Sequence, residues 1–193
     1  VRRLWMKKMI LIISISIVSL VILVGIFYLL VISGAIFSFG PNPEKPEITY
    51  GEFPFKLVYE IDGETKVIED TIICEFDGFV NRGTAGKVRR WKTTLKSGNE
   101  KLTLLNLRPL EVTNEFGQTI LELYFYYGTA AYYMGDNTNP FARDAQGFDY
   151  VSYEFQTADG KTGKSGYEAE EAYEKFNIRL ISWEVSEPIQ NTF

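Results

Sequence analysis

A long charge-free run near the N-terminus most constrains how this chain can fold. From Met9 to Pro43 the sequence contains no Asp, Glu, Lys or Arg. A bilayer's hydrocarbon core is about 30 Å thick, and a helix rising about 1.5 Å per residue crosses it in about 20 apolar residues. The run exceeds that length, so we expect the helix to tilt or to end in the membrane interface. The sequence therefore predicts a transmembrane helix over residues 9–40.

The charges before this run predict its orientation. Four basic residues lie in a short tail at residues 1–8: Arg2, Arg3, Lys7 and Lys8. Membrane proteins keep such residues in the cytoplasm, so we expect the N-terminus inside and the rest of the chain outside the cell membrane. A cleaved signal peptide is the alternative, because Ser33 and Ala35 form a small-x-small site. A signal peptide's apolar region has about 7 to 15 residues, and this run is about twice as long, which favours a retained single-pass anchor.

Two amino-acid counts restrict the chemistry of the chain. It has no histidine, which excludes histidine-dependent hydrolysis, histidine-ligated zinc and histidine pH switches. It has one cysteine, Cys74, which allows neither an internal disulfide nor a cysteine-rich metal site. Cys74 is in phase with Ile72 and Phe76, and on a strand these residues share a face. We therefore interpret Cys74 as a small buried hydrophobic residue, and we expect no cofactor.

The part of the chain that follows the helix is acidic. Four of the 20 Lys and Arg residues precede the helix, which leaves 16 of them against 25 Asp and Glu residues. The average field of such a domain should not attract nucleic acid or an anionic bilayer. Residues 9–40 are therefore the expected contact with the membrane, and nucleic acid is not an expected partner.

A proline-rich linker and a series of alternating runs make up the outer part. Residues 41–47, PNPEKPE, contain three prolines and predict a stiff, extended spacer. Residues 48–193 contain seven or eight runs of alternating apolar and polar residues, and Asp62-Gly63 between the first two predicts a hairpin. This spacing predicts a mainly β domain with one short helix in its C-terminal half. An extracytoplasmic β-sandwich is the leading architecture, and a partly open barrel is the alternative.

The segment Gly163-Lys164-Ser165 is similar to the end of a phosphate-binding loop but departs from the motif. The first glycine of that motif should stand at position 158, which is Ala158. Ser165 and Glu168 instead form a Ser-x-x-Glu capping box, which predicts that a helix begins there. The apolar residues that follow at helical spacing predict its buried face: Ala169, Ala172, Tyr173 and Phe176. No nucleotide partner is therefore expected.

The stretch from Glu122 to Tyr150 combines many aromatic residues with a long polar loop at about residues 135–148. Loops of this length are often functional, and tyrosine rings beside amides and carboxylates suit a sugar or a muropeptide. The candidate ligand-binding residues are Tyr132, Tyr133, Asp136, Asn137 and Asp144. The alternative is that the aromatic residues fill the core and the polar residues cap turns. Calcium is disfavoured, because the spacing departs from that of known calcium loops and Pro140 falls at a ligand position.

A basic stripe is the second candidate for binding. In GKVRRWKTTLK, alternation places Arg90, Lys92 and Lys96 on one face of a predicted strand. On an acidic domain this face is suited to an acidic partner protein or a wall polyanion. The alternative is a solvated strand face, whose lysines also discourage pairing with other strand edges.

Three phrases carry a resemblance to known proteins: ITYGEFPFKLVYEIDGETKVIEDTIICEFDGF, KSGNEKLTLLNL and AYYMGD. Through them the chain resembles a group of small membrane-anchored bacterial proteins of Firmicutes type. The resemblance covers most of residues 1–140 and implies one N-terminal membrane helix and one extracytoplasmic β domain. It implies no catalytic residue.

These observations predict a membrane protein whose outer β domain is a non-enzymatic interaction module for a surface protein or a cell-wall component. A small-ligand binder that uses the tyrosine-rich loop is the second hypothesis. A carboxylate-based hydrolase is the third, and it would need acids that converge in a cleft, which the sequence does not indicate.

Overall fold

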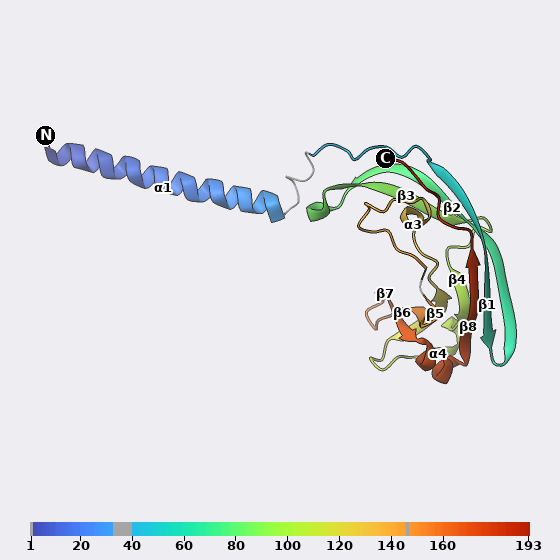
Figure 1. The fold of residues 1–193 in the computed structure, drawn as a ribbon. Coiled ribbons are helices and arrows are strands. Elements are labelled where there is room, and N and C mark those ends of the chain that lie inside the picture. Colours follow the sequence, from blue (N-terminus) through green and yellow to red (C-terminus); the bar gives the residue numbers. More distant parts are fainter. Residues whose placement is uncertain (1, 33–39, 146) are drawn as a thin grey trace. The chain divides into compact units, whose positions relative to one another are not determined.

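The computed structural model describes residues 2–32, 40–145 and 147–193 (Figure 1). The chain divides into two compact units. The first comprises residues 1–44 and 79–89, and the second comprises residues 45–78 and 90–193. Each unit is described by itself.

The first unit is dominated by helix α1 (Arg2–Ile32). Its segment Leu11–Val31 has 21 residues, none of them buried, and is long and apolar enough to span a membrane. At about 1.5 Å per residue this segment measures about 31 Å, close to the hydrocarbon thickness of a bilayer. The helix begins at Arg2, so residues 2–8 of the predicted basic tail are helical, and residues 33–39 of the predicted span lie outside the described residues.

The first unit also contains a hairpin tip at residues 79–89, which includes the short 3-10 helix η1 (Gly83–Ala85). The Arg82 amide donates to the Gly86 carbonyl at 2.8 Å and closes the tip. The buried Arg89 donates from Nε to the Glu44 carbonyl at 2.7 Å. This bond ties the hairpin tip to the chain that leads away from α1.

The strands of the described residues form two four-stranded antiparallel sheets, in the orders β3-β2-β1-β8 and β4-β5-β6-β7. The first sheet comprises β1 (Tyr50–Ile61), β2 (Glu64–Asn81), β3 (Lys87–Leu95) and β8 (Ile178–Val185). The second comprises β4 (Leu102–Asn106), β5 (Thr119–Phe125), β6 (Tyr150–Gln156) and β7 (Thr162–Glu168). Besides η1, three short helices lie between the described strands: η2 (Arg108–Leu110), α3 (Ala130–Tyr133) and α4 (Ala169–Phe176). The prediction of a mainly β domain is confirmed.

Local sequence explains the first hairpin. From Phe53 to Tyr59 of β1, every second side chain is buried, and those between them are more exposed. Asp62 and Gly63 both have positive φ, 52° and 78°, and the ladder closes at the Ile61–Glu64 pair. A two-residue turn with both φ positive matches the right-handed twist of the flanking strands. The hairpin predicted from Asp62-Gly63 is thus confirmed.

Both sheets contribute to one hydrophobic core in the second unit. Trp183 of β8 packs against Phe55 of β1 and Phe125 of β5, with ring centroids 4.9 Å apart in each case. The Tyr59 hydroxyl of β1 donates to the Leu104 carbonyl of β4 at 3.3 Å. Cys74 lies in this core without exposed surface, as predicted, and burial raises the pKa of its thiol to about 12.

The prediction of a capping box at Ser165 is wrong. Ser165 lies within β7, opposite Tyr153 of β6, and the strand continues to Glu168. Helix α4 begins at Ala169, and Glu168 precedes it without a side-chain capping bond. Pairing with β6 satisfies the backbone groups that the capping box would have served, and it buries Tyr167. Gly163-Lys164-Ser165 is therefore part of a strand and does not precede a helix N-terminus.

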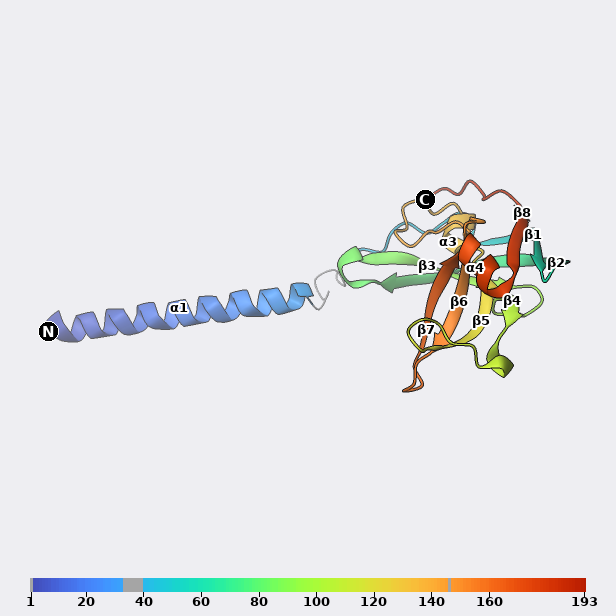
Figure 2. The same cartoon turned by 90° about the horizontal axis from the view of Figure 1, so that it is seen from below.

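Helix α4 is shorter and later than predicted, and it lies beside β6, β7 and β8 (Figure 1, Figure 2). Of its predicted buried face, Ala172 is fully buried and Phe176 packs partly against the core. Tyr173 is instead 41 % exposed. Its ring lies 4.6 Å from the guanidinium of Arg179, so it covers the surface of the first sheet rather than the core.

The end of the proline-rich linker is attached to the C-terminal segment. The Glu47 amide donates to the Thr192 carbonyl at 3.2 Å, and the Ile48 amide donates to Asn191 Oδ1 at 3.1 Å. Asn191 Nδ2 donates in return to the Ile48 carbonyl at 2.8 Å. The last residues of the predicted spacer therefore belong to the β domain, and the two ends of the domain lie side by side.

Candidate functional site

A pocket at the tyrosine-rich loop contains part of the predicted ligand site. Tyr132 and Asn137 line it together with Gly135 and residues 187–191, and its volume is about 290 Å³. We call this hollow the loop pocket. Partial burial raises the pKa of Tyr132, and the adjacent carboxylates of Asp144 and Glu187 raise it further. The structure thus brings Tyr132, Asn137 and Asp144 together.

Tyr133 and Asp136 lie in the interior instead. The Tyr133 ring packs 5.1 Å from that of Phe53, and its hydroxyl donates to the Tyr127 carbonyl at 2.5 Å. Burial raises the pKa of this hydroxyl. Asp136 has no exposed surface, and its Oδ2 accepts a bond of 2.9 Å from Trp91 Nε1. This corrects the expectation that both residues face a ligand: Tyr133 fills the core, and Asp136 holds the loop to β3.

The C-terminal segment forms the second wall of the loop pocket. The Ile189 amide donates to the Tyr133 carbonyl at 2.9 Å. Gly135 has a φ of +66°, and a Cβ at this position would lie 2.4 Å from the Ile189 carbonyl oxygen. Glycine is therefore required for the segment to pass this close to the loop. No periodic pattern in residues 186–193 marks them as part of a site, and sequence reasoning missed them.

The predicted basic stripe is present but electrically compensated. Arg90, Lys92 and Lys96 are exposed on the first sheet. Arg90 and Lys92 face acids on the neighbouring strand β2, Asp77 at 2.9 Å and Glu75 at 4.0 Å. Lys96, which directly follows β3, faces Glu52 on β1 at 3.5 Å. Exposed pairs of this kind add little stability, but they cancel the local positive field. The stripe is therefore a weak attractor for a polyanion.

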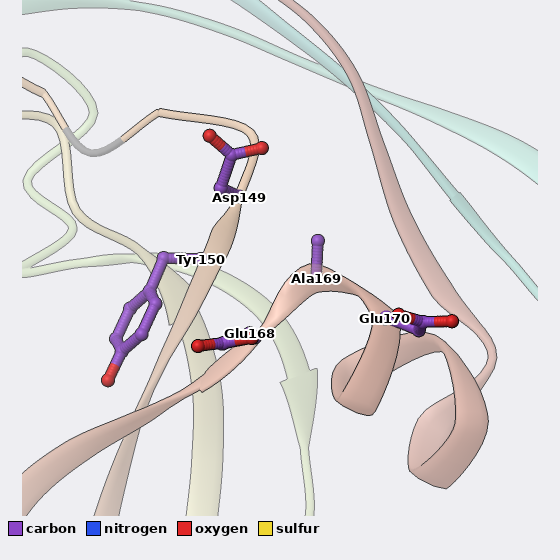
Figure 3. A pocket seen from close by; sticks show the side chains of 5 residues that line it. All are labelled: Asp149, Tyr150, Glu168, Ala169 and Glu170. Carbon is purple, nitrogen blue, oxygen red and sulfur yellow. The ribbon is translucent and has the colours of Figure 1, made fainter.

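Three acidic side chains line a broader hollow between β6 and the start of α4. Its lining residues are Asp149, Tyr150, Glu168, Ala169 and Glu170 (Figure 3). In Figure 3 the three carboxylates point in different directions, and only Glu168 is directed toward Tyr150. Among the residues that the structure describes, no group of three His, Cys, Asp or Glu side chains is placed to hold a metal ion. This hollow has neither the convergence of a cation site nor that of an acid/base pair.

A charged cluster on the second sheet was missed by sequence reasoning. Lys101 Nζ lies 2.6 Å from Glu122 Oε1 and also contacts a carboxylate oxygen of Glu154. Thr103 donates its hydroxyl to Glu122 Oε2 at 3.0 Å. Glu122 and Glu154 stand directly opposite each other on β5 and β6. The three charged side chains are only 15–22 % exposed, which distinguishes this cluster from the exposed pairs of the first sheet.

Hydrogen bonding favours the charged forms of Lys101 and Glu122. Burial alone would lower the pKa of Lys101, but the hydrogen bonds and charges of Glu122 and Glu154 raise it. Burial would likewise raise the pKa of Glu122, but the bonds from Lys101 and Thr103 lower it. The alternation in KLTLLNL and TILELYFYY places Lys101 and Glu122 opposite the buried leucines. Alternation indicates only which face of its strand each side chain occupies. The contact between Lys101 and Glu122 depends on the order of the strands in the sheet.

Comparison of the chain with protein-family models, with curated proteins and with solved structures gives no significant match. No family is therefore assigned, and the resemblance to membrane-anchored bacterial proteins stays an expectation.

Proposed function

We propose that the chain is a single-pass membrane protein whose β domain is a non-enzymatic module that binds a protein or a cell-wall component outside the cell membrane. Helix α1 supports the anchor, because Leu11–Val31 is long and apolar enough to span a bilayer. The basic residues before it support a cytoplasmic N-terminus. The acidic β domain then lies on the outer side.

The apolar helix α1 carries the proposal of an anchored module, and the Lys101 cluster bears on the question of catalysis. A general acid or base works best when its pKa lies near the operating pH. In this cluster the pKa of Lys101 is raised and that of Glu122 is lowered, so both move away from neutrality. Paired charges of this kind are poorly suited to proton transfer, so the cluster does not favour an enzyme.

We further propose a sandwich rather than a barrel for the β domain. Among the described strands, none belongs to both sheets, and each sheet keeps its own pair of edge strands. A barrel would require hydrogen bonding to continue around the closed sheet. The side chains of both sheets meet in one core, as they do between the layers of a sandwich.

The loop pocket favours a second candidate function, the binding of a small ligand such as a sugar or a muropeptide. It combines the Tyr132 ring with the amide of Asn137 and nearby carboxylates in about 290 Å³. This volume is close to the lower end of small-molecule pockets, which is about 300 Å³. Tyr132→Ala should weaken such binding, whereas Tyr173→Ala, at an exposed tyrosine of α4, should not.

Orientation is tested by labelling intact cells with a membrane-impermeant maleimide. Single cysteines replace Lys8 and Glu170, which are both exposed. The natural Cys74 gives little background because it is buried and its pKa is raised to about 12. We expect Glu170→Cys to be labelled and Lys8→Cys to be protected. The reverse pattern would refute the orientation.

Binding is tested by sedimentation of the detergent-solubilised full chain with purified wall sacculi, alongside cross-linking in its own membrane. We expect saturable sedimentation or one specific cross-linked partner. The absence of both would contradict the proposed module.

A further inference from the structure

Strand β7 is an edge of the second sheet, at the end of the order β4-β5-β6-β7. Two backbone bonds continue its ladder with β6 in the same register. The Thr157 amide donates to the Lys161 carbonyl at 2.8 Å, and the Ala169 amide donates to the Asp149 carbonyl at 2.9 Å. In an antiparallel ladder, opposite residues exchange hydrogen bonds at every second pair. Residues 161, 163, 165, 167 and 169 therefore turn their backbone groups toward β6.

The residues between them turn their backbone groups away from β6, toward the outside of the sheet: Thr162, Lys164, Gly166 and Glu168. The Glu168 carbonyl begins the first turn of α4. Within the described part of the chain, no other segment bonds to the remaining outward groups. Such a row of amides and carbonyls is a template for a further strand.

The two charged side chains of β7 make this edge complementary to itself. Lys164 and Glu168 are both exposed, and neither forms an ion pair among the described residues. They are four residues apart, so they lie on the same face of the strand. A lysine on an edge strand usually discourages pairing. Here an acid near the other end of the same strand offers that lysine a partner when a second copy runs antiparallel.

One register of two β7 strands satisfies both the charges and the backbone. With a two-fold axis at Gly166, Lys164 lies opposite Glu168 of the second copy, and this happens twice. The two Gly166 residues then exchange backbone bonds, and they carry no side chain that could keep the strands apart. An axis at Lys164 would place two lysines opposite each other, and an axis at Ser165 would leave both charges without a direct partner.

The hollow between β6 and the start of α4 has room for the lysine of the second copy. Its volume is about 520 Å³, and its described lining includes Asp149, Glu168 and Glu170 but no lysine or arginine. Tyr150 and Glu168, which stand opposite each other on β6 and β7, place this hollow on the face that carries Lys164. Figure 3 shows that the three carboxylates do not converge. An ammonium group needs only one of them, Glu168, and the others add to the negative field.

We propose that two copies of this chain pair through their β7 edges, antiparallel about Gly166, and join their second sheets into one continuous sheet. The backbone bonds supply the attraction, and the two Lys164–Glu168 pairs set the register. The ladder is short, so anchoring of both copies in one membrane assists it by raising their effective concentration. This inference goes beyond the binding function proposed above and does not depend on its partner or ligand.

The test uses the full chain in phosphatidylcholine vesicles with a short, membrane-permeant bis-maleimide. Ser165→Cys is the reporter, because Ser165 is exposed and lies diagonally across the axis from its own copy, at about 7–8 Å. We expect it to form a covalent dimer. Thr65→Cys, at an exposed position of β2 in the other sheet, is the matched control and should not cross-link. The buried Cys74 gives little background.

Charge reversal on the Ser165→Cys background tests the register. Lys164→Glu and Glu168→Lys each place like charges opposite each other twice. Each should weaken association about tenfold, measured from the cross-linked fraction over a series of protein-to-lipid ratios. The double variant Lys164→Glu/Glu168→Lys brings opposite charges together again, so it should associate nearly as well as the parent.

Each result decides one part of the inference. A folded Ser165→Cys chain that cross-links no more than Thr65→Cys would overturn the pairing. Dimers that tolerate both single reversals, or a folded double variant that stays monomeric, would overturn the contact between Lys164 and Glu168. Cross-linking of Ser165→Cys in cells to a different protein, in place of a second copy, would overturn self-pairing. Thermal midpoints identify variants that unfold, and the Ser165→Cys result alone then decides. Sedimentation with sacculi is independent of all these results.

Discussion

Replacing Gly135 by alanine tests whether the C-terminal segment is locked onto the tyrosine-rich loop. Gly135 has a φ of +66°, and an added Cβ would lie 2.4 Å from the Ile189 carbonyl oxygen. The left-handed backbone alone costs an alanine about 1 kcal/mol. The overlap is with a backbone atom, so a rotamer change cannot relieve it. The segment must therefore move away from the loop.

Displacement of the segment breaks specific hydrogen bonds. The bond from the Ile189 amide to the Tyr133 carbonyl is lost first, and the paired bonds between Asn191 and Ile48 are strained with it. Each such bond contributes about 1 kcal/mol. We expect Gly135→Ala to lower the free energy of unfolding by about 3 kcal/mol in total.

Gly160→Ala is the matched control. Gly160 has a φ of +83°, but an added Cβ meets nothing within 4 Å. It should cost only the backbone term of about 1 kcal/mol. Urea unfolding followed by tryptophan fluorescence measures both variants, and hydrogen exchange at the Ile189 amide reports the segment directly. Equal destabilisation by the two variants, with a protected Ile189 amide, would refute this reasoning.

Three further changes test the core and the charged cluster. Tyr167→Phe should raise the thermal midpoint of unfolding, because the Tyr167 hydroxyl is buried without a hydrogen-bond partner among the described residues. A buried group of this kind costs about 1–3 kcal/mol of stability. A lower midpoint would show that the hydroxyl is hydrogen-bonded in the wild-type protein. Cys74→Ser should destabilise the domain by about 1–3 kcal/mol through a buried hydroxyl, and the wild-type thiol should react with maleimide only after unfolding. The folded pKa of Glu122 is lowered, so its stabilisation is present above the unfolded pKa of about 4.3 and is lost as the pH falls through the folded value. Glu122→Gln should therefore flatten the acid limb of a pH–stability curve, and an unchanged acid limb would contradict that role.

Structural features that depend only on residues close together in the sequence could be predicted from the sequence. The apolar run of α1 needs no partner to be read as a helix, because its backbone bonds form within the segment. The hairpin at Asp62-Gly63 depends on two residues that tolerate positive φ. The burial of Cys74 depends on alternation along one strand.

The prediction of a helix cap from local sequence failed because the segment pairs with another strand instead. Ser165 and Glu168 have the spacing of a capping box, yet this segment pairs with β6 instead. The ladder satisfies more backbone groups than one cap, and it buries the Tyr167 ring against Tyr153, with centroids 4.5 Å apart. Local propensity gave way to tertiary pairing.

The sequence by itself determined the helix that can span a membrane, the mainly β character of the domain and the loop in which tyrosines gather. Only the tertiary structure decided which of the adjacent Tyr132 and Tyr133 faces a pocket, because the pocket's other wall is the C-terminal segment. It also brought Lys101 between Glu122 and Glu154, residues far apart along the chain. Alternation tells which face of a strand a side chain occupies, but strand order and register decide which side chains it meets.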